Sequence, residues 1–377
     1  MRANIFNFFI VLILVFDMGG DLGIRSLAVV LMLISMVDVF FTNSKITLSD
    51  NIFFETGFLF FVLIFWPTFL LLKSQANGFD LSISISQISS LFFAFFYFIY
   101  RSLTPKVSGL NNLVNSLFML SLFYFLMLLV FFINEKFFLN VASYFSDRGL
   151  YAGIRKENID LPNVYLKASL FLFFAFIFLL DRGFVRSIIV YVGSIITTSK
   201  MLFIFNSVFL FLKMRLRNKF FLLFLIFPAI VFLFFKDMTE ILNYLSSAFD
   251  SRSVTASKRI SDFYSVIELF DSDKKNFLFG FGPGSVMYSH YSNADVVNIE
   301  LDHLNTIRKF GLIWFVILLG YFLRVAFHLY KTSKYAVLIG LIGVFILSGI
   351  NPVLISPVFF IILFECRFIN TRIKSNV

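Results

Sequence analysis

Residues 300–309 (ELDHLNTIRK) place an imidazole and two cations within one short stretch of the sequence. His303 titrates near neutral pH and can take a proton from a hydroxyl group, as a general base does. Arg308 and Lys309 follow within about two helical turns and can balance negative charge. A lone histidine at a membrane interface is more often structural, so this stretch by itself leaves its chemistry open.

A glycine-rich loop precedes this stretch, with Gly280, Gly282 and Gly284 in the sequence FGFGPGS. Glycine allows backbone conformations that other residues avoid, and such a loop can turn its N–H groups toward an anion. The alternative is a plain turn that re-enters the membrane surface. The pattern alone does not decide between the two.

Arg259 lies in a stretch that we predict to be an amphipathic helix, residues 257–270, with apolar residues 260, 263, 264, 267 and 270 on one face. The helix would lie on the outer membrane surface or pack over the helix bundle. It would hold Arg259, and with it Arg252, over a cavity, because the planar fork of arginine suits phosphate oxygens. The alternative is a simple interfacial anchor.

Three further cations are candidates for the same anionic substrate. Lys200 lies at the junction of two predicted spans, where unpaired charge is expensive and usually faces a cavity or a partner. Arg148 and Arg155 lie in a predicted outer loop, where the alternative is that they are simply solvated.

Composition indicates the kind of element that must position these groups. Hydrophobic residues make up 59% of the 377 residues, charged residues 14%, and the mean hydropathy is +0.90. Soluble domains carry about 25% charged residues, so we predict an integral membrane protein. One cysteine, Cys366, excludes a disulfide framework, and three histidines leave little material for a zinc site.

Long continuous apolar runs predict helical spans rather than a barrel. We predict an all-α, polytopic protein with about twelve spans in a single membrane domain, residues 1–377. The expected spans are 4–20, 23–41, 52–72, 82–100, 110–133, 164–181, 184–199, 200–213, 219–235, 304–323, 335–350 and 352–367.

The distribution of basic residues predicts the orientation. With both termini in the cytoplasm, the inner segments hold half of the 32 lysines and arginines, and the short outer turns hold very few. The net charge of +10 then reports topology rather than nucleic-acid binding. Two long loops, 134–163 and 236–303, face outward, and no nucleotide-binding motif occurs on the inner side.

The order of these features resembles the O-antigen polymerase and ligase superfamily of bacterial inner membranes. The resemblance covers roughly residues 185–330. It rests on Ser199-Lys200 between two spans, on Arg259 upstream of the loop of Gly280, Gly282 and Gly284, and on His303 followed by Gly311. Lys200 stands where the family pattern has arginine, and Leu304 separates His303 from Asn305.

The resemblance implies a multi-spanning, GT-C-like glycosyltransferase that needs no metal or other cofactor. Its substrate would be an undecaprenyl diphosphate-linked oligosaccharide, used on the periplasmic side in lipopolysaccharide biosynthesis. His303 would activate the acceptor hydroxyl, and Arg259 and Lys200 would neutralise the diphosphate leaving group. A chain-length regulator protein and membrane lipid would be partners, and nucleic acid would not.

Three functions stay open at this point. A polymerase would join lipid-linked repeat units into a polysaccharide with inversion of configuration. A ligase would use the same chemistry to transfer the glycan to lipid A-core. A flippase for lipid-linked oligosaccharides would fit the span count equally well, although transporters commonly show two related halves and the sequence shows no such repeat.

Overall fold

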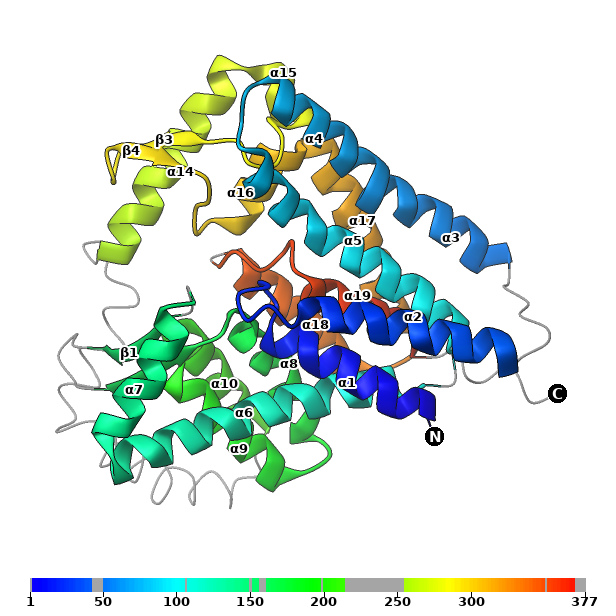
Figure 1. Ribbon diagram of the computed structural model, residues 1–377, viewed down its shortest axis with the longest axis vertical. Helices are drawn as coiled ribbons and strands as arrows, with labels where there is room; N and C mark the ends of the chain where they lie inside the picture. Colours follow the sequence, from blue (N-terminus) through cyan, green and yellow to red (C-terminus); the bar gives the residue numbers. More distant parts are fainter. Residues whose placement is uncertain are drawn as a thin grey trace. The chain divides into compact units, whose positions relative to one another are not determined.

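The computed structural model describes residues 2–42, 50–105, 107–148, 151–155, 161–197, 199–213, 254–349 and 351–369, and it is mostly helical (Figure 1). The ninth expected span, 219–235, lies outside the described residues. The chain forms two compact units, Met1–Ser116 with Ser257–Val377, and Leu117–Ala256. We call them unit 1 and unit 2 and describe each by itself.

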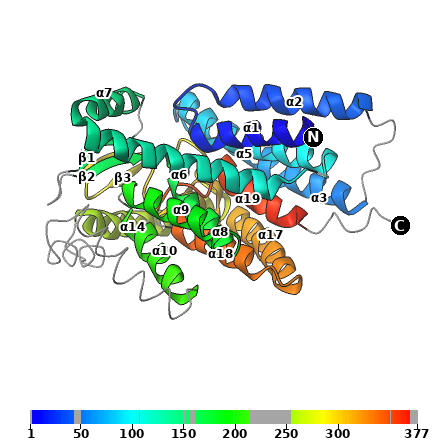
Figure 2. The same cartoon turned by 90° about the horizontal axis from the view of Figure 1, so that it is seen from below.

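Unit 1 begins with antiparallel helices and ends with a second group of helices. The elements of its N-terminal part are α1 (Arg2–Phe16), α2 (Arg25–Thr42), α3 (Asp50–Phe60), the π-helical η1 (Phe61–Phe65), α4 (Trp66–Ala76), α5 (Leu81–Leu103) and the first residues of α6 (Gly109–Ile133). Its C-terminal elements are α14 (Val254–Ser272), α15 (Lys274–Phe279), β3 (Met287–Ser289), β4 (Ala294–Val296), α16 (Asp302–Phe310), α17 (Leu312–Lys331), α18 (Tyr335–Ser348) and α19 (Pro357–Phe368). Helices α1 and α2 lie side by side (Figure 2).

Unit 2 continues α6 and contains the first long loop of the sequence. Its other elements are α7 (Glu135–Ser146), β1 (Tyr151–Arg155), β2 (Leu161–Tyr165), the 3-10 helix η2 (Lys167–Phe171), α8 (Leu172–Leu180), α9 (Phe184–Ile196) and α10 (Lys200–Lys213). Strands β1 and β2 pair antiparallel, as do β3 and β4 of unit 1. The described residues therefore add two small hairpins to the all-α architecture expected from the sequence.

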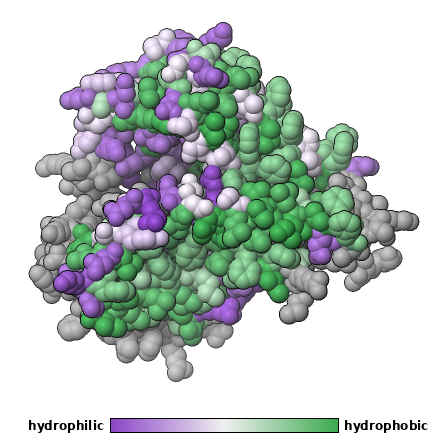
Figure 3. Space-filling model, in the orientation of Figure 1, coloured by the Kyte–Doolittle hydropathy of each residue, from purple (hydrophilic) through white to green (hydrophobic). Residues whose placement is uncertain are grey.

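Four helical segments are long and apolar enough to cross a membrane: Asp50–Ala76, Leu81–Leu103, Gly109–Ile133 and Leu312–Lys331. The shorter apolar helices are Ala3–Phe16, Lys167–Leu180, Phe184–Ser194, Met201–Leu212 and Tyr335–Ser348. These apolar helices indicate a membrane protein. On the face shown in Figure 3, hydrophobic residues cover α3 to α5, whereas hydrophilic residues gather over α14, β3 and β4.

A π-helical turn in the first long span explains how this span attaches to α17. Pro67 has no N–H, and the Trp66 N–H bonds to the Phe61 carbonyl, so the carbonyl of Val62 lacks a donor from its own helix. The Trp314 indole of α17 supplies it, at 2.7 Å. The Trp66 indole in turn donates to the carbonyl of Phe310 at the end of α16, at 3.0 Å. Both tryptophans thus fix α16 and α17 against this span.

The expected span 304–323 differs from the observed elements. The structure divides this region at Gly311 into the polar helix α16 and the apolar helix α17. Gly311 has φ +90° and lies against Gly280, which has φ +88°; a Cβ on either would come within 2.7–2.8 Å of the other's backbone nitrogen and still closer to the backbone just before it. Arg308 and Lys309 therefore belong to a separate helix that precedes the span.

Candidate functional site

The glycine loop joins α16 to the hairpin of α4 and α5. Phe281 and Gly282 donate their N–H groups to the carbonyls of Arg308 and Lys309, at 2.8 and 3.0 Å. On the other side of the loop, the Pro283 carbonyl accepts from the hydroxyls of α4 and α5, Ser74 and Ser84. The loop is thus a joint between three helices of unit 1.

The N–H groups of this loop are occupied within the protein. Gly280 donates to Asn276, Gly284 to the side chain of Gln87 at 3.0 Å, and Ser285 to Gly282. Pro283 has no N–H to offer. Gly282 and Gly284 have φ +105° and +78°, so the glycines are explained by backbone conformation and close approach. In this arrangement the loop positions α16, and it does not present N–H groups to an anion.

Arg308 is fully buried and is held by neutral oxygens. Its guanidinium donates to the carbonyls of Ser285 and Val297, at 2.8 and 2.6 Å, and to the Asn305 side chain at 2.9 Å. Its Nε has no hydrogen-bond partner. Burial lowers the pKa of Arg308 to about 10.

Lys309 is also buried, and it contacts the side chain of Asn298. Burial, together with the neighbouring charge of Arg308, lowers its pKa well below the ordinary value. Among the described residues, no carboxylate lies within ion-pair distance of Arg308 or Lys309. Two cations on one helix are therefore buried with amide, hydroxyl and carbonyl oxygens as their contacts.

Asp302 and His303 begin α16, and both attach it to the end of α18 and the segment after it. Burial raises the pKa of Asp302 to about 7, and its carboxylate accepts the N–H of Leu354. The His303 ring lies 4.6 Å from the Phe345 ring and 5.8 Å from the Phe315 ring, centroid to centroid. Its Nε2 lies 3.3 Å from Ser348 Oγ, and burial lowers its pKa.

Arg259 lies on α14 and forms an ion pair with Glu300, just before α16. Its Nε lies 2.9 Å from the carboxylate, and Lys258 also approaches that carboxylate, at 3.5 Å. The Arg259 side chain is 28% exposed. Arg259, His303, Arg308 and the glycine loop thus all lie in unit 1, on α14, on α16 and on the segment between these helices.

Helix α14 packs against unit 1 through a face other than the predicted apolar one, so the apolar face does not pack over the bundle, and its placement on the outer membrane surface stays a prediction. Val266 and Phe270 form a buried cluster with Met287 and Ile299, and Asp262 accepts the hydroxyl of Ser289. Of the predicted apolar face only Phe270 is buried, whereas residues 260, 263, 264 and 267 are exposed. Polar side chains fit the packed face because the β3 hairpin gives them partners.

The remaining predicted site residues lie elsewhere in the chain. Arg148 is exposed after α7, with its guanidinium 3.7 Å from the ring centroid of Tyr144. Arg155 ends β1 and Lys200 begins α10, and these three belong to unit 2. Arg252 lies outside the described residues.

Sequence reasoning gave no role to several residues that shape this site. Asp302, Asn298, Ser348 and Gly349 each contact one of the predicted groups or a neighbour of it. The signal that could have found two of them is the run Ser348-Gly349-Ile350-Asn351-Pro352, which is polar and turn-forming between two apolar helices. Within the described residues, no group of three or more His, Cys, Asp or Glu side chains could hold a metal ion.

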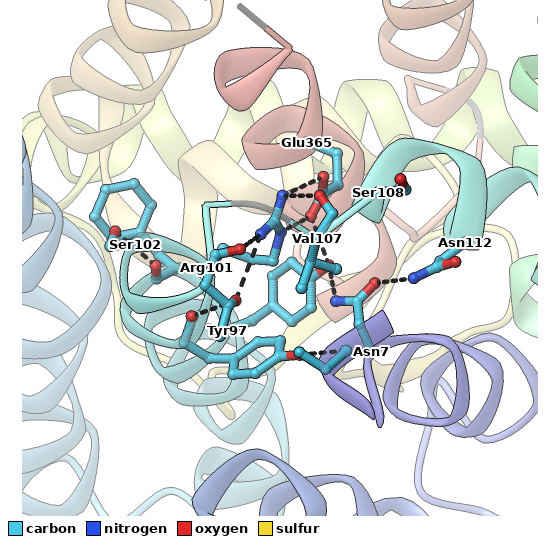
Figure 4. Close-up of polar contacts among 12 residues, drawn as sticks. Asn7, Tyr97, Arg101, Ser102, Val107, Ser108, Asn112 and Glu365 are labelled. Atoms are coloured by element: carbon cyan, nitrogen blue, oxygen red, sulfur yellow. Dashed lines mark hydrogen bonds and ion pairs between the residues drawn. The ribbon is translucent and has the colours of Figure 1, made fainter. Parts of the chain in front are cut away.

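A second buried polar cluster connects four helices of unit 1 (Figure 4). Glu365 of α19 pairs with Arg101 of α5 and accepts the Tyr97 hydroxyl at 2.7 Å. The Asn7 amide donates to the Tyr97 hydroxyl, and the Asn112 amide donates to Asn7, at 3.2 and 2.8 Å. Each of these five side chains has a hydrogen-bond or ion-pair partner, which fits a structural cross-link.

Comparisons of the chain with protein-family models, with curated proteins and with solved structures find no match. The class that the fold itself defines is a mostly helical protein with four candidate membrane-spanning helices. Any narrower assignment depends on the chemistry of the site on α16.

Proposed function

We propose that the protein is an O-antigen polymerase, an inverting, metal-independent glycosyltransferase. It would span the bacterial inner membrane about twelve times, with both termini in the cytoplasm and a GT-C-like fold. It would join undecaprenyl diphosphate-linked repeat units into polysaccharide at the periplasmic face, in lipopolysaccharide biosynthesis. The resemblance described above supplies this identity.

One observation carries the proposal: α16 holds one imidazole and two buried cations directly before an apolar span. His303, Arg308 and Lys309 lie on nine residues of helix, and Gly311 separates that helix from the span α17. A general base and positive charge at a membrane entrance suit a hydroxyl acceptor and a lipid-anchored diphosphate.

Each residue then has a defined chemical task. His303 removes the proton of the acceptor hydroxyl as that oxygen attacks the anomeric carbon. The bond from that carbon to the diphosphate breaks on the opposite face, which inverts the configuration. Arg259, Arg308 and Lys309 stabilise the negative charge that develops on the departing diphosphate, where preorganised cations have their largest effect.

Four further cations complete the proposal. Three belong to unit 2, and the fourth, Arg252, lies outside the described residues. Lys200 is assigned to the diphosphate, and Arg252, Arg148 and Arg155 to the substrate. A chain-length regulator protein is the expected partner, as the resemblance implies.

The direct test is the loss of chain extension in two variants. His303→Ala and Arg259→Ala should abolish polysaccharide formation from lipid-linked repeat units while protein abundance stays normal. His290→Ala and His328→Ala are matched controls, because they remove the other two histidines. Full-length glycan from His303→Ala or Arg259→Ala would remove that residue from the proposed site.

Deletion of the gene separates the related functions. Core carrying a single repeat unit indicates a polymerase, whereas core alone indicates a ligase that transfers glycan to lipid A-core. In reconstituted bilayers, translocation of the lipid-linked oligosaccharide without new glycosidic bonds would instead indicate a flippase.

A further inference from the structure

The hydrogen bonds at the end of α18 define which nitrogen of His303 carries a proton. The Ser348 hydroxyl donates to the carbonyl of Phe345, one turn back, at 2.7 Å. A serine has one hydroxyl hydrogen, so its oxygen then acts toward the His303 ring as an acceptor. Nε2 is the ring atom that faces this oxygen, at 3.3 Å. While the hydroxyl donates to Phe345, this contact places the proton on Nε2.

The side chains around His303 favour a neutral ring. The described side chains around the ring are Phe315 of α17 with Phe345 and Ser348 of α18, and none of them carries charge. The adjacent carboxylate, Asp302, is engaged with the backbone N–H of Leu354. These uncharged surroundings favour the neutral imidazole, in which Nε2 carries the proton and Nδ1 does not.

Gly349 keeps the space beside Nδ1 free of a side chain. A Cβ at this position would lie 3.2 Å from both Nδ1 and Cε1 of His303. The backbone of Gly349 is helical, with φ −59° and ψ −22°, so its conformation does not require glycine. What the glycine provides here is room next to the unprotonated nitrogen.

We propose that Ser348 is a positioning residue that holds His303 as the Nε2–H tautomer, and that Nδ1 is the atom that accepts the proton of the sugar hydroxyl. This inference rests on the proposed function. The acceptor O–H bond breaks as its proton goes to Nδ1, and the oxygen forms the bond to the anomeric carbon. The bond from the anomeric carbon to the diphosphate oxygen breaks at the same time, and its electron pair leaves with that oxygen, so charge and atoms balance.

Nitrogen NMR tests the tautomer without using enzyme activity. A variant with His290→Asn and His328→Asn retains His303 as its single histidine. Labelled with ¹⁵N-histidine and reconstituted into lipid at pH 8, it should show a protonated Nε2 and an unprotonated Nδ1. A protonated Nδ1 in this spectrum would overturn the inference.

Kinetics of three variants test the two supporting residues with lipid-linked repeat units purified from cells that lack the gene. Ser348→Ala should lower kcat about tenfold, leave KM unchanged and lower the His303 pKa in an NMR titration, because the imidazolium loses an acceptor. Ser348→Thr, which restores the hydroxyl, should restore both quantities. Gly349→Ala should lower kcat at least about tenfold while the Nε2–H signal persists.

The outcomes distinguish a failure of this inference from a failure of the proposed function. Unchanged kcat and unchanged His303 pKa in Ser348→Ala would remove Ser348 from the mechanism. Normal kcat in Gly349→Ala would show that Nδ1 is not the reacting atom. Normal chain extension in His303→Ala would instead refute the proposed base itself, whatever the tautomer.

Discussion

Unit 1 buries charge on α19 and on α16, and it partners the two sets differently. On α19, Glu365 meets Arg101 with an Oε2–Nη2 distance of 3.1 Å, and Arg367 meets both oxygens of Glu55 at 3.0–3.2 Å. On α16, Arg308 and Lys309 contact amide, hydroxyl and carbonyl oxygens.

Under the proposed function, the difference separates a structural role from a catalytic one. A buried ion costs several kcal/mol of desolvation, about as much as a well-placed opposite charge returns. The pairs on α19 are balanced in this way and link α19 to α5 and α3. On α16 the carboxylate of Asp302 interacts with Lys309, whereas among the described residues no carboxylate lies within ion-pair distance of the buried Arg308 guanidinium. An anionic ligand would complete that balance, whereas α19 needs nothing further.

Removing Lys309 is the strongest way to break this comparison. Lys309→Met should lower chain extension about 10²–10³-fold, the usual effect of losing one preorganised electrostatic group. The free energy of unfolding should not fall, because a neutral side chain avoids the cost of burying charge. Initial rates in proteoliposomes measure the effect on chain extension, and thermal unfolding measures the effect on stability.

The matched control is Lys274→Met, which neutralises an exposed lysine on α15. It should leave the rate and the unfolding temperature near those of the unchanged protein. If Lys309→Met also extends chains at the normal rate, the unpaired cations of α16 have no part in catalysis.

The paired charges should respond in the opposite way. Glu365→Gln leaves the Arg101 guanidinium buried without its counterion, so the free energy of unfolding should fall by about 3–5 kcal/mol. The rate per folded molecule should stay normal, because the proposed reaction assigns no role to this cluster. Denaturation in detergent and initial rates are the two measurements.

A double variant sharpens that result. Arg101→Met with Glu365→Leu removes both charges and should recover most of the stability lost in Glu365→Gln, since buried pairs often tolerate apolar replacement. A stable Glu365→Gln protein with impaired chain extension would place this cluster in the functional site instead.

The positions of the long helices could be predicted from the sequence because hydropathy alone determines them. The expected spans 52–72, 82–100 and 110–133 fall within Asp50–Ala76, Leu81–Leu103 and Gly109–Ile133. The division at Gly311 could not, because it depends on the close approach of Gly280 from another part of the chain. The sequence names both glycines without showing that they touch.

The partners of charged residues could not be predicted from the sequence either. Arg259 is visible in the sequence as a cation, but its pairing with Glu300 arises from the packing of α14 through Val266 and Phe270. Hydrophobic periodicity predicted a different face because it depends only on the positions of apolar residues. It gives no information on the hydrogen bond that Asp262 accepts from the Ser289 hydroxyl of β3. Tertiary hydrogen bonds decide such cases.

The pH dependence of the reaction offers a finer test of the α16 cluster. Burial lowers the pKa of His303, and the base must be unprotonated to act. The rate should therefore fall as pH drops through this lowered pKa, so the acidic limb of kcat should lie below the ordinary value of about 6.5. Because the pairs on α19 are not part of the reaction, Glu365→Gln should leave this limb in place. A limb above 6.5 would contradict a buried, neutral His303.

The smallest effect is expected at Lys200, the first residue of α10. Lysine offers a point charge and arginine a planar fork of donors. Lys200→Arg therefore keeps the positive charge and adds the ability to donate two parallel hydrogen bonds. If charge alone stabilises the diphosphate, this variant should keep the rate within a few-fold of the original, whereas Lys200→Met should reduce it about tenfold or more. Equal rates for the unchanged protein and both variants would remove Lys200 from the site. The cations that stabilise the diphosphate would then be Arg259, Arg308 and Lys309 of unit 1.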